Sequence, residues 1–193
     1  MDLNSINLLS KKLRINIIKS SHKAKIPHLG SCLSCADILS YLYENEIRID
    51  PNDPFSPNRD RLILSKGHAA PALFQILALK NIINNDTISK IGSNGSYLHE
   101  HPPKPGTIPG IEAATGSLGH GLPIALGIAK AAKIQKKSFK IFVIVGDGEC
   151  NEGSIWEAAL LAPILNLDNL IVFIDFNKWQ ATGKSEEISN LNP

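Results

Sequence analysis

Apolar residues occur along this chain in two patterns, and each pattern predicts a different kind of element. Near the start of the chain they are spaced three and four residues apart, which predicts a helix over 3–23. The positions in this helix are Ile6, Leu9, Leu13 and Ile17. Short continuous apolar runs elsewhere are typical of buried strands. These runs cover 61–65, 141–145 and 170–174.

Helical patterns lie between and around these strands, and polar or proline-rich segments separate them. Further helices are predicted over 34–44, 69–80, 119–133 and 153–165. A turn is expected at 27–31, surface loops at 50–57 and 182–193, and a long irregular segment at 92–118. The alternation of strands and helices predicts an α/β fold, with a Rossmann-like parallel sheet and helices on both faces. We expect one domain over 1–193.

Composition excludes several classes of function. The 193 residues carry a net charge of +2, which gives no indication of nucleic-acid binding. The lysines at 11–25 and 133–140 are interpreted as solvated helix faces. No apolar run approaches the ~20 residues that span a membrane, and the first residues do not resemble a signal peptide. Three cysteines fit a reducing compartment, so a cytoplasmic location is expected.

Two of the cysteines form a Cys-x-x-Cys pattern at Cys32 and Cys35. No second pair completes a zinc site, and both lie beside a predicted core-facing helix. A structural role is therefore favoured over redox or metal chemistry, which remains the alternative.

The main candidate for chemistry is a Gly-Asp-Gly turn after the apolar run 141–145. Asp147 lies in this turn, and Asn177 follows the next run at 170–174. Because both would lie at the carboxyl ends of parallel strands, we expect them to meet where such sheets bind ligands. Carboxylate and amide oxygens suit a hard divalent cation, and the glycines allow backbone N–H groups to approach phosphate.

Five motifs in order give the chain a family resemblance. They are His-Leu-Gly-Ser from His28, Ser-Lys-Gly-His-Ala around His68, His-Glu-His-Pro ending at Pro102, Thr-Gly-Ser-Leu-Gly from Thr115, and Gly-Asp-Gly-Glu-x-x-Glu-Gly-x-x-Trp-Glu-Ala over 146–158. Together they resemble the transketolase family, and specifically the N-terminal, thiamine-diphosphate-binding subunit of its two-subunit members. The resemblance covers nearly the whole chain and implies the thiamine-diphosphate-binding fold of the diphosphate (PP) type.

The resemblance also implies a role for each site residue. Asp147, Asn177 and the carbonyl of Trp179 would hold Mg²⁺, with Ca²⁺ or Mn²⁺ as substitutes. The sugar would face His28 and His101. The remaining cofactor-binding positions implied are His68, Thr115, Gly116, Ser117, Leu118, Gly146, Gly148, Glu152 and Asn177. Glu152 is expected in an acidic cluster at a subunit interface, and a helix-capping role is its alternative.

The implied activity is transfer of a two-carbon unit between a ketose phosphate and an aldose phosphate. The activating glutamate of the family lies on a pyrimidine-binding domain, so we expect a complementary C-terminal subunit. We also expect a homodimer of such pairs, a heterotetramer. The family's domain continues past 193, so an incomplete C-terminus and a poorly protected sheet edge are expected as well.

Two alternatives to this activity remain open. They are a related thiamine-diphosphate enzyme, such as a deoxyxylulose-phosphate synthase or one of a specialised sugar pathway, and an inactive partner-binding remnant. A Rossmann dehydrogenase is excluded, because no Gly-x-Gly-x-x-Gly follows the first strand.

Overall fold

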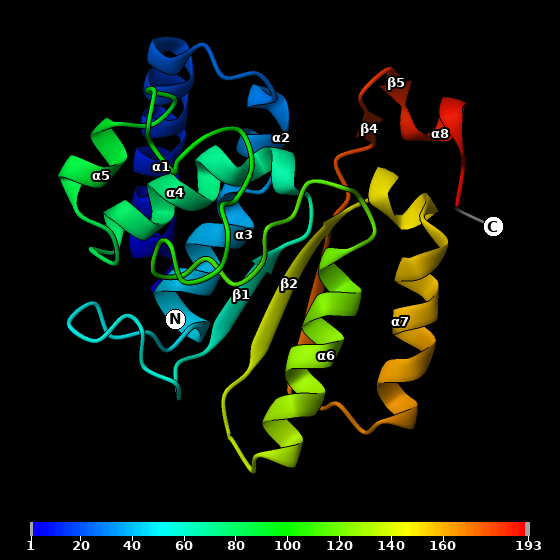
Figure 1. Ribbon diagram of the computed structural model, residues 1–193. Helices are drawn as coiled ribbons and strands as arrows, with labels where there is room; N and C mark the ends of the chain where they lie inside the picture. The colour runs from blue at the N-terminus through cyan, green and yellow to red at the C-terminus, as the bar shows by residue number, and fades with distance from the viewer. Residues whose placement is uncertain (1, 192–193) are drawn as a thin grey trace.

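Three parallel strands form the centre of the molecule (Figure 1). In the computed structural model, which describes residues 2–191, they are β1 (Arg61–Leu64), β2 (Ile141–Gly146) and β3 (Leu170–Asp175). Their order is β1-β2-β3, so β2 is central. In the β2–β3 register, Gly146 lies opposite Asp175 at the carboxyl end of the sheet.

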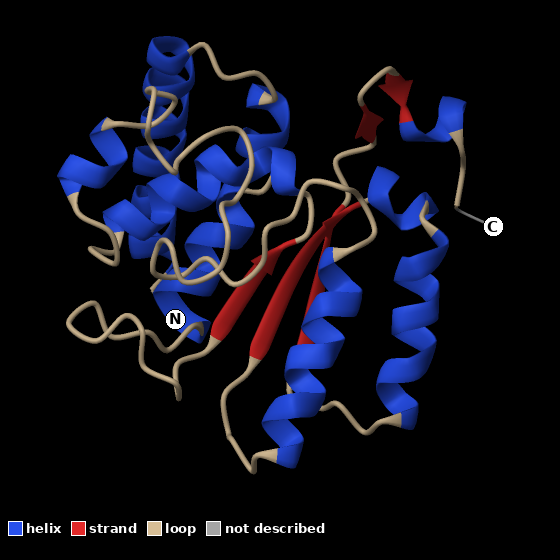
Figure 2. Cartoon of the chain, viewed as in Figure 1, coloured by secondary structure: helices blue, strands red, loops and turns tan. Residues whose placement is uncertain are grey.

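Helices cover both faces of this sheet, which confirms the predicted fold class (Figure 2). One face packs against α1 (Leu3–Ala24), α3 (Ala36–Tyr41) and α4 (Ala70–Leu79). The other face packs against α6 (Gly121–Ile134) and α7 (Gly153–Ile164). Side chains alternate along each strand, and this divides the core into two layers.

Strand β2 shows this division most clearly, because all six of its residues are buried. Phe142 and Ile144 belong to the core beneath α1 and α4, whereas Val143 and Val145 belong to the core beneath α6 and α7. A strand buried on both faces reads as a continuous apolar run, and this explains why its position could be predicted from the sequence.

The first helix also agrees with its sequence pattern. Ile6, Leu13 and Ile17 are buried as expected, and Leu9 is partly buried. At the start of α1, the Asp2 carboxylate accepts a hydrogen bond from the Asn4 N–H at 2.9 Å and so caps the helix.

The segment after α1 differs from the prediction. A helix, α2 (Leu29–Ser34), begins inside the predicted turn at 27–31, and the predicted helix over 34–44 is interrupted at Cys35. It resumes as α3 and ends in a π-helical turn, Leu42–Glu46. His28, just before α2, has a left-handed backbone with φ of 66°. Hydrophobic spacing along the chain does not reveal such a turn.

Smaller elements complete the chain. The turns Gly67–Ala69 and Gly148–Asn151 are 3₁₀-helical, and 92–118 contains neither helix nor strand, as predicted. A short helix that was not predicted, α5 (Asn85–Ser89), is capped by the Asn84 side chain. The tail predicted as a loop at 182–193 instead contains β5 (Gly183–Lys184), which pairs with β4 (Trp179–Gln180), and α8 (Ser185–Ile188). Positions 192 and 193 lie outside the described residues.

Strand β3 is an edge strand of the described sheet and is poorly covered. Val172 is 41% exposed and Ile174 is 55% exposed, and Phe176 just beyond the strand is exposed as well. Such apolar side chains on an open edge are the feature expected from the sequence. Across residues 2–191, none of the helices combines the length and the apolar character that crossing a membrane requires.

Candidate functional site

The candidate site lies where the three parallel strands end. Because their carboxyl ends share one edge of the sheet, the segments that follow them converge. β1 leads into the turn that contains His68, β2 leads into the Gly-Asp-Gly turn, and β3 leads into the loop that contains Asn177. The sequence prediction that Asp147 and Asn177 share one edge agrees with this arrangement.

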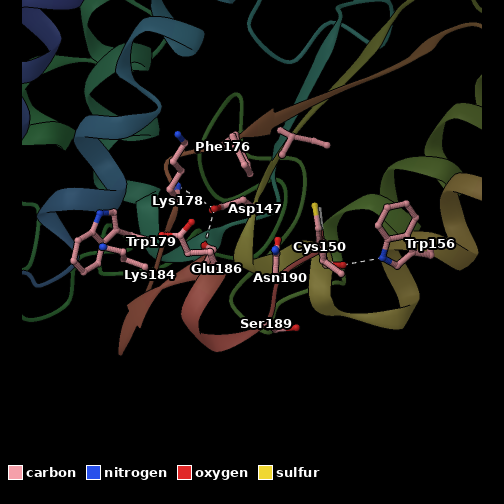
Figure 3. A pocket seen from close by; sticks show the side chains of 13 residues that line it. Asp147, Cys150, Trp156, Phe176, Lys178, Trp179, Lys184, Glu186, Ser189 and Asn190 are labelled. Atoms are coloured by element: carbon pink, nitrogen blue, oxygen red, sulfur yellow. Dashed lines mark hydrogen bonds between the residues drawn. The ribbon is translucent and has the colours of Figure 1, made fainter. Parts of the chain in front are cut away.

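Asp147 is buried and holds the loop after β3. Its Oδ2 atom accepts hydrogen bonds from the Lys178 N–H at 3.0 Å and from the Ser185 hydroxyl at 2.7 Å. Its own N–H donates to the Asp175 carbonyl at 3.2 Å. Figure 3 shows the side chain pointing toward the Lys178–Glu186 segment, with dashed lines for its bonds. The carboxylate therefore binds the residue that lies between Asn177 and Trp179, the other two expected metal ligands.

Asn177 and Trp179 lie within that same loop. The Asn177 Oδ1 atom accepts from the Trp179 N–H at 2.8 Å, and its Nδ2 group donates to Ser34 Oγ at 3.4 Å. Residues 2–191 contain no cluster of three or more His, Cys, Asp or Glu suited to a metal. A cation here would depend on one carboxylate, one amide oxygen and one carbonyl, a set of oxygens that fits Mg²⁺ with bound phosphate.

The backbone at Gly148 lies directly against the Gln180 side chain. A Cβ atom at Gly148 would lie 2.7 Å from Cγ of Gln180, so only glycine allows the backbone to approach this side chain. The Gln180 Nε2 group is buried and has no hydrogen-bond partner among the described residues. A buried amide donor beside a glycine turn is suited to an anionic oxygen. The residues present therefore fit the diphosphate of the expected cofactor.

Three histidines from distant parts of the sequence surround a second part of the site. The rings of His28 and His68 are 5.4 Å apart. Burial, together with the charges of Lys66, His28 and His101, lowers the pKa of His68 to about 4. His68 is therefore neutral near pH 7, which leaves one ring nitrogen as an acceptor and the other as a donor.

His101 reaches the same place through the irregular segment. Its Cδ2 atom lies 3.1 Å from the position that a Cβ on Gly116 would occupy, so the ring packs over the Gly116 backbone. His28 and His101 are both exposed, whereas His68 is partly buried. Two accessible imidazoles beside a partly buried one agree with the division between sugar and cofactor contacts expected from the sequence, and this division stays a prediction.

The segment 115–118 is tied to the end of β1. The Thr115 hydroxyl donates to the Leu64 carbonyl at 2.6 Å. A Cβ atom at Gly67 would lie 2.5 Å from the Thr115 carbonyl carbon, so a side chain there would separate the two turns. Ser117 is exposed and Leu118 is partly buried, so both side chains lie near the surface.

Gly146 is the first residue of the Gly-Asp-Gly turn, and Glu152 follows the turn at the start of α7. Glu152 is exposed at the N-terminus of α7, and its side chain makes no capping hydrogen bond. The capping alternative for Glu152 is therefore not supported, which leaves the carboxylate accessible to a partner. Gly146 ends β2, and its N–H donates to Glu149 Oε2 at 3.1 Å.

Sequence reasoning missed four polar residues at this site. Lys66 and Asp175 form a buried ion pair, and the Ser34 hydroxyl donates to Asp175 Oδ2 at 2.5 Å. Glu149 is buried within the Gly-Asp-Gly-Glu motif itself. Lys66 and Glu149 lie inside two of the five motifs. A charged residue within an apolar, glycine-rich segment was therefore the signal that could have marked both as site residues. Ser34 and Asp175 carried no comparable signal.

The Cys-x-x-Cys pattern belongs to the core. Cys32 and Cys35 are buried and unpaired. Burial raises the pKa of Cys32 to about 11 and that of Cys35 to about 12, so both are protonated thiols near neutral pH. These properties support the structural role favoured from the sequence.

A pocket of about 570 Å³ opens beside Asp147 (Figure 3). It lies between the end of β3, the start of α7 and the β4–α8 segment, and its wall includes Trp156, Phe176 and Trp179. The Trp156 indole N–H donates to the Cys150 carbonyl at 2.8 Å, which fixes that ring at the rim.

Comparisons with known proteins agree with this geometry. Residues 6–191 match the family described as the thiamine diphosphate binding domain of transketolase. The chain is 41% identical over 191 residues to an apulose-4-phosphate transketolase subunit of Phocaeicola vulgatus, covering 99% of this chain and 67% of that protein. It is 43% identical over 171 residues to the 6-deoxy-6-sulfo-D-fructose transketolase subunit SqwG of Clostridium sp. (strain MSTE9), covering 89% and 62%.

Solved structures give the same result. The chain superimposes on transketolase from Campylobacter jejuni with a TM-score of 0.91 and 33% identity, covering 100% of this chain and 31% of that one. It thus spans about two thirds of the subunit relatives and about one third of that transketolase. The match along residues 6–191 and the level of identity place this chain in the family of transketolase thiamine-diphosphate-binding domains.

Proposed function

We propose that this chain is the cofactor-binding part of a split transketolase, which transfers a two-carbon ketol unit from a ketose phosphate to an aldose phosphate. The observation that carries the proposal is the convergence of Asp147, the Asn177 loop and three histidines at the carboxyl edge of one parallel sheet. Thiamine diphosphate, when bound, supplies the carbon nucleophile that accepts and releases the two-carbon unit.

The residues of this chain would bind the metal and the diphosphate and would orient the cofactor. Asp147, Asn177 and the Trp179 carbonyl would hold Mg²⁺, and the Gly148 turn with the orphaned Gln180 amide would bind the diphosphate. Neutral His68 would add one hydrogen bond near the diphosphate without repelling the metal. Ca²⁺ or Mn²⁺ would serve in place of Mg²⁺, because the ligands are all oxygens.

The exposed imidazoles would face the sugar. His28 and His101 lie beside His68, on the accessible side of the site. Polyol substrates require many donors and acceptors, and imidazole provides either and moves protons near neutral pH. In this arrangement the two histidines bind the substrate hydroxyls and shuttle a proton at the reacting carbonyl.

The proposed partner is a complementary subunit that carries the pyrimidine-binding domain and its activating glutamate. Relatives named as subunits support this, because each name implies a second chain. Glu152 is exposed and its side chain makes no capping bond, so its carboxylate would be accessible to a second copy in a homodimer of such pairs. The three unpaired, buried thiols are consistent with a cytoplasmic enzyme.

A second candidate differs in the substrate alone. The relatives act by name on apulose 4-phosphate and on 6-deoxy-6-sulfo-D-fructose, so a specialised sugar pathway fits this chain as well. Assays that compare xylulose 5-phosphate with these two sugars, using the assembled enzyme, would distinguish the candidates by their relative kcat/KM values.

Calorimetry tests the proposed function itself. The chain assembled with its complementary subunit is titrated with thiamine diphosphate in the presence of Mg²⁺. We expect saturable binding that Asp147→Ala abolishes and that EDTA reverses. Asp168→Asn is the matched control, because this aspartate is exposed and pairs only with Lys133 in the described part of the chain. Unchanged affinity in Asp147→Ala would contradict the assigned metal site.

A further inference from the structure

The carboxylate of Glu149 is among the most buried charged groups of the molecule. The residue is 2% exposed and lies in the 3₁₀ turn between the Gly-Asp-Gly motif and α7. Its Oε1 atom accepts from the Ser65 hydroxyl at 2.5 Å and from the Gly119 N–H at 2.9 Å. Its Oε2 atom accepts from the Gly146 N–H at 3.1 Å.

These three donors mark the ends of three separate segments of the proposed site. Ser65 precedes the turn that contains His68, and Gly119 directly follows the Thr115–Leu118 segment. Gly146 precedes Asp147. The Glu149 side chain therefore joins three of the segments that are proposed to contact the cofactor. The loop after β3 is the segment that it does not join.

The chemistry of the three donors requires a carboxylate. An ionised glutamate only accepts hydrogen bonds and offers two oxygens, which match three converging donors. Glutamine would replace one oxygen by an NH₂ group. The Ser65 hydroxyl can rotate and accept from that group, but a backbone N–H cannot, so Gly119 or Gly146 would lose its acceptor in either orientation of the amide.

We propose that Glu149 is a positioning residue, which holds the His68 turn, the 115–118 segment and the Gly-Asp-Gly turn in the arrangement that binds the cofactor before the cofactor arrives. This inference rests on the proposed function and assigns Glu149 no contact with the ligand. Its effect is pre-organisation, because segments that are already ordered lose less conformational freedom on binding.

Two variants separate this role from general destabilisation. Glu149→Gln keeps the shape of the side chain and removes one acceptor. Ile17→Val is a matched destabilised control, because Ile17 is fully buried in α1 among apolar side chains. Glu157→Gln controls for the loss of a glutamate charge at an exposed position of α7. Each variant is titrated with thiamine diphosphate and Mg²⁺ after assembly with the complementary subunit.

We expect Glu149→Gln to weaken cofactor binding by about tenfold, the effect of losing one charge-assisted hydrogen bond. Ile17→Val and Glu157→Gln should bind as the unmodified chain does. Hydrogen exchange without cofactor gives a second readout, in which the amide of Glu149→Gln that loses its acceptor, either Gly119 or Gly146, should exchange faster. If Glu149→Gln fails to fold, Ser65→Ala removes one donor and leaves the carboxylate bonded to both backbone amides, with a smaller loss of affinity expected.

The outcomes are distinguishable. An unmodified assembly that binds no thiamine diphosphate contradicts the proposed function and this inference with it. Normal binding by both the unmodified chain and folded Glu149→Gln, or by Ser65→Ala where that variant replaces it, contradicts the inference alone. Equal losses of affinity in Glu149→Gln and Ile17→Val would also overturn it, because the effect would then follow stability rather than position.

Discussion

The Nζ atom of Lys66 lies 2.6 Å from Oδ2 of Asp175, with side chains that are 2% and 6% exposed. The lysine follows β1 and the aspartate ends β3, so the ion pair connects the two outer strands beyond the carboxyl end of β2. Ser34 of α2 donates to the same carboxylate oxygen and accepts from the Asn177 amide. A buried polar cluster of Lys66, Asp175 and Ser34 thus holds together the His28 turn, the His68 turn and the Asn177 loop.

Removing the lysine should destabilise the fold strongly. Lys66→Met leaves the Asp175 carboxylate buried without its cation, which costs about 3–5 kcal/mol. The double variant Lys66→Met/Asp175→Leu, which removes both charges, should recover most of this loss. Urea unfolding of the three proteins measures the difference. A double variant no more stable than Lys66→Met would show that the cost arises from packing instead.

The histidines should separate into two classes. His28→Ala and His101→Ala should lower kcat/KM for the sugar by about 10²-fold or more, as loss of a proton-transfer group does, with cofactor affinity nearly unchanged. His68→Ala should instead weaken thiamine diphosphate binding. Steady-state kinetics and calorimetry on the assembled enzyme check this separation, and His22→Ala, on the exposed end of α1, is the control. Equal losses of cofactor affinity in all three site variants would refute it.

Acid should destabilise the chain partly through His68. Its pKa falls from 6.5 to about 4 on folding, because of burial and the charges of Lys66, His28 and His101, which the Asp175 charge only partly offsets. Below pH 6.5 the unfolded chain takes up a proton at His68 that the folded chain does not. His68 therefore does not lower the free energy of unfolding above pH 6.5, and lowers it progressively as the pH falls toward 4. In His68→Gln, the decrease in urea midpoint between pH 7 and pH 5 should be smaller than in the unmodified chain. An equal decrease would show that other groups dominate.

The uncovered edge should drive self-association of the isolated chain, and the chain should show no transketolase activity without its partner. Ile174 on β3 and Leu160 and Ile164 on α7 are 55%, 71% and 73% exposed. Exposed apolar side chains of this kind favour association. Sedimentation velocity should show oligomers that Ile174→Lys reduces, whereas Ile134→Lys, at the far end of α6, should have less effect. A monodisperse monomer that transfers two-carbon units by itself would contradict both expectations.

The strands and motif residues could be predicted because each carries a local signal. Runs such as 141–145 are buried on both faces, and Gly148 next to Asp147 reflects a backbone that lies close to the Gln180 side chain. The break at Cys35 and the short hairpin after Trp179 depend on contacts with distant segments, such as Ser34 with Asp175 and Asp147 with Ser185. No spacing along the chain encodes such contacts, so these features became visible only in the structure.

The pairing of β1 with β2 has a consequence for how the chain folds. Arg61 lies opposite Ile141, so the sheet cannot begin to form at this position until a long intervening stretch has been synthesised and has folded back. Contacts between residues so far apart in sequence slow folding. During synthesis, β1 would wait with its apolar residues unpaired until β2 leaves the ribosome. The three strand ends would become neighbours only after β3 has followed β2, so the capacity to bind a cofactor should arise in the last stage of folding rather than accumulate gradually.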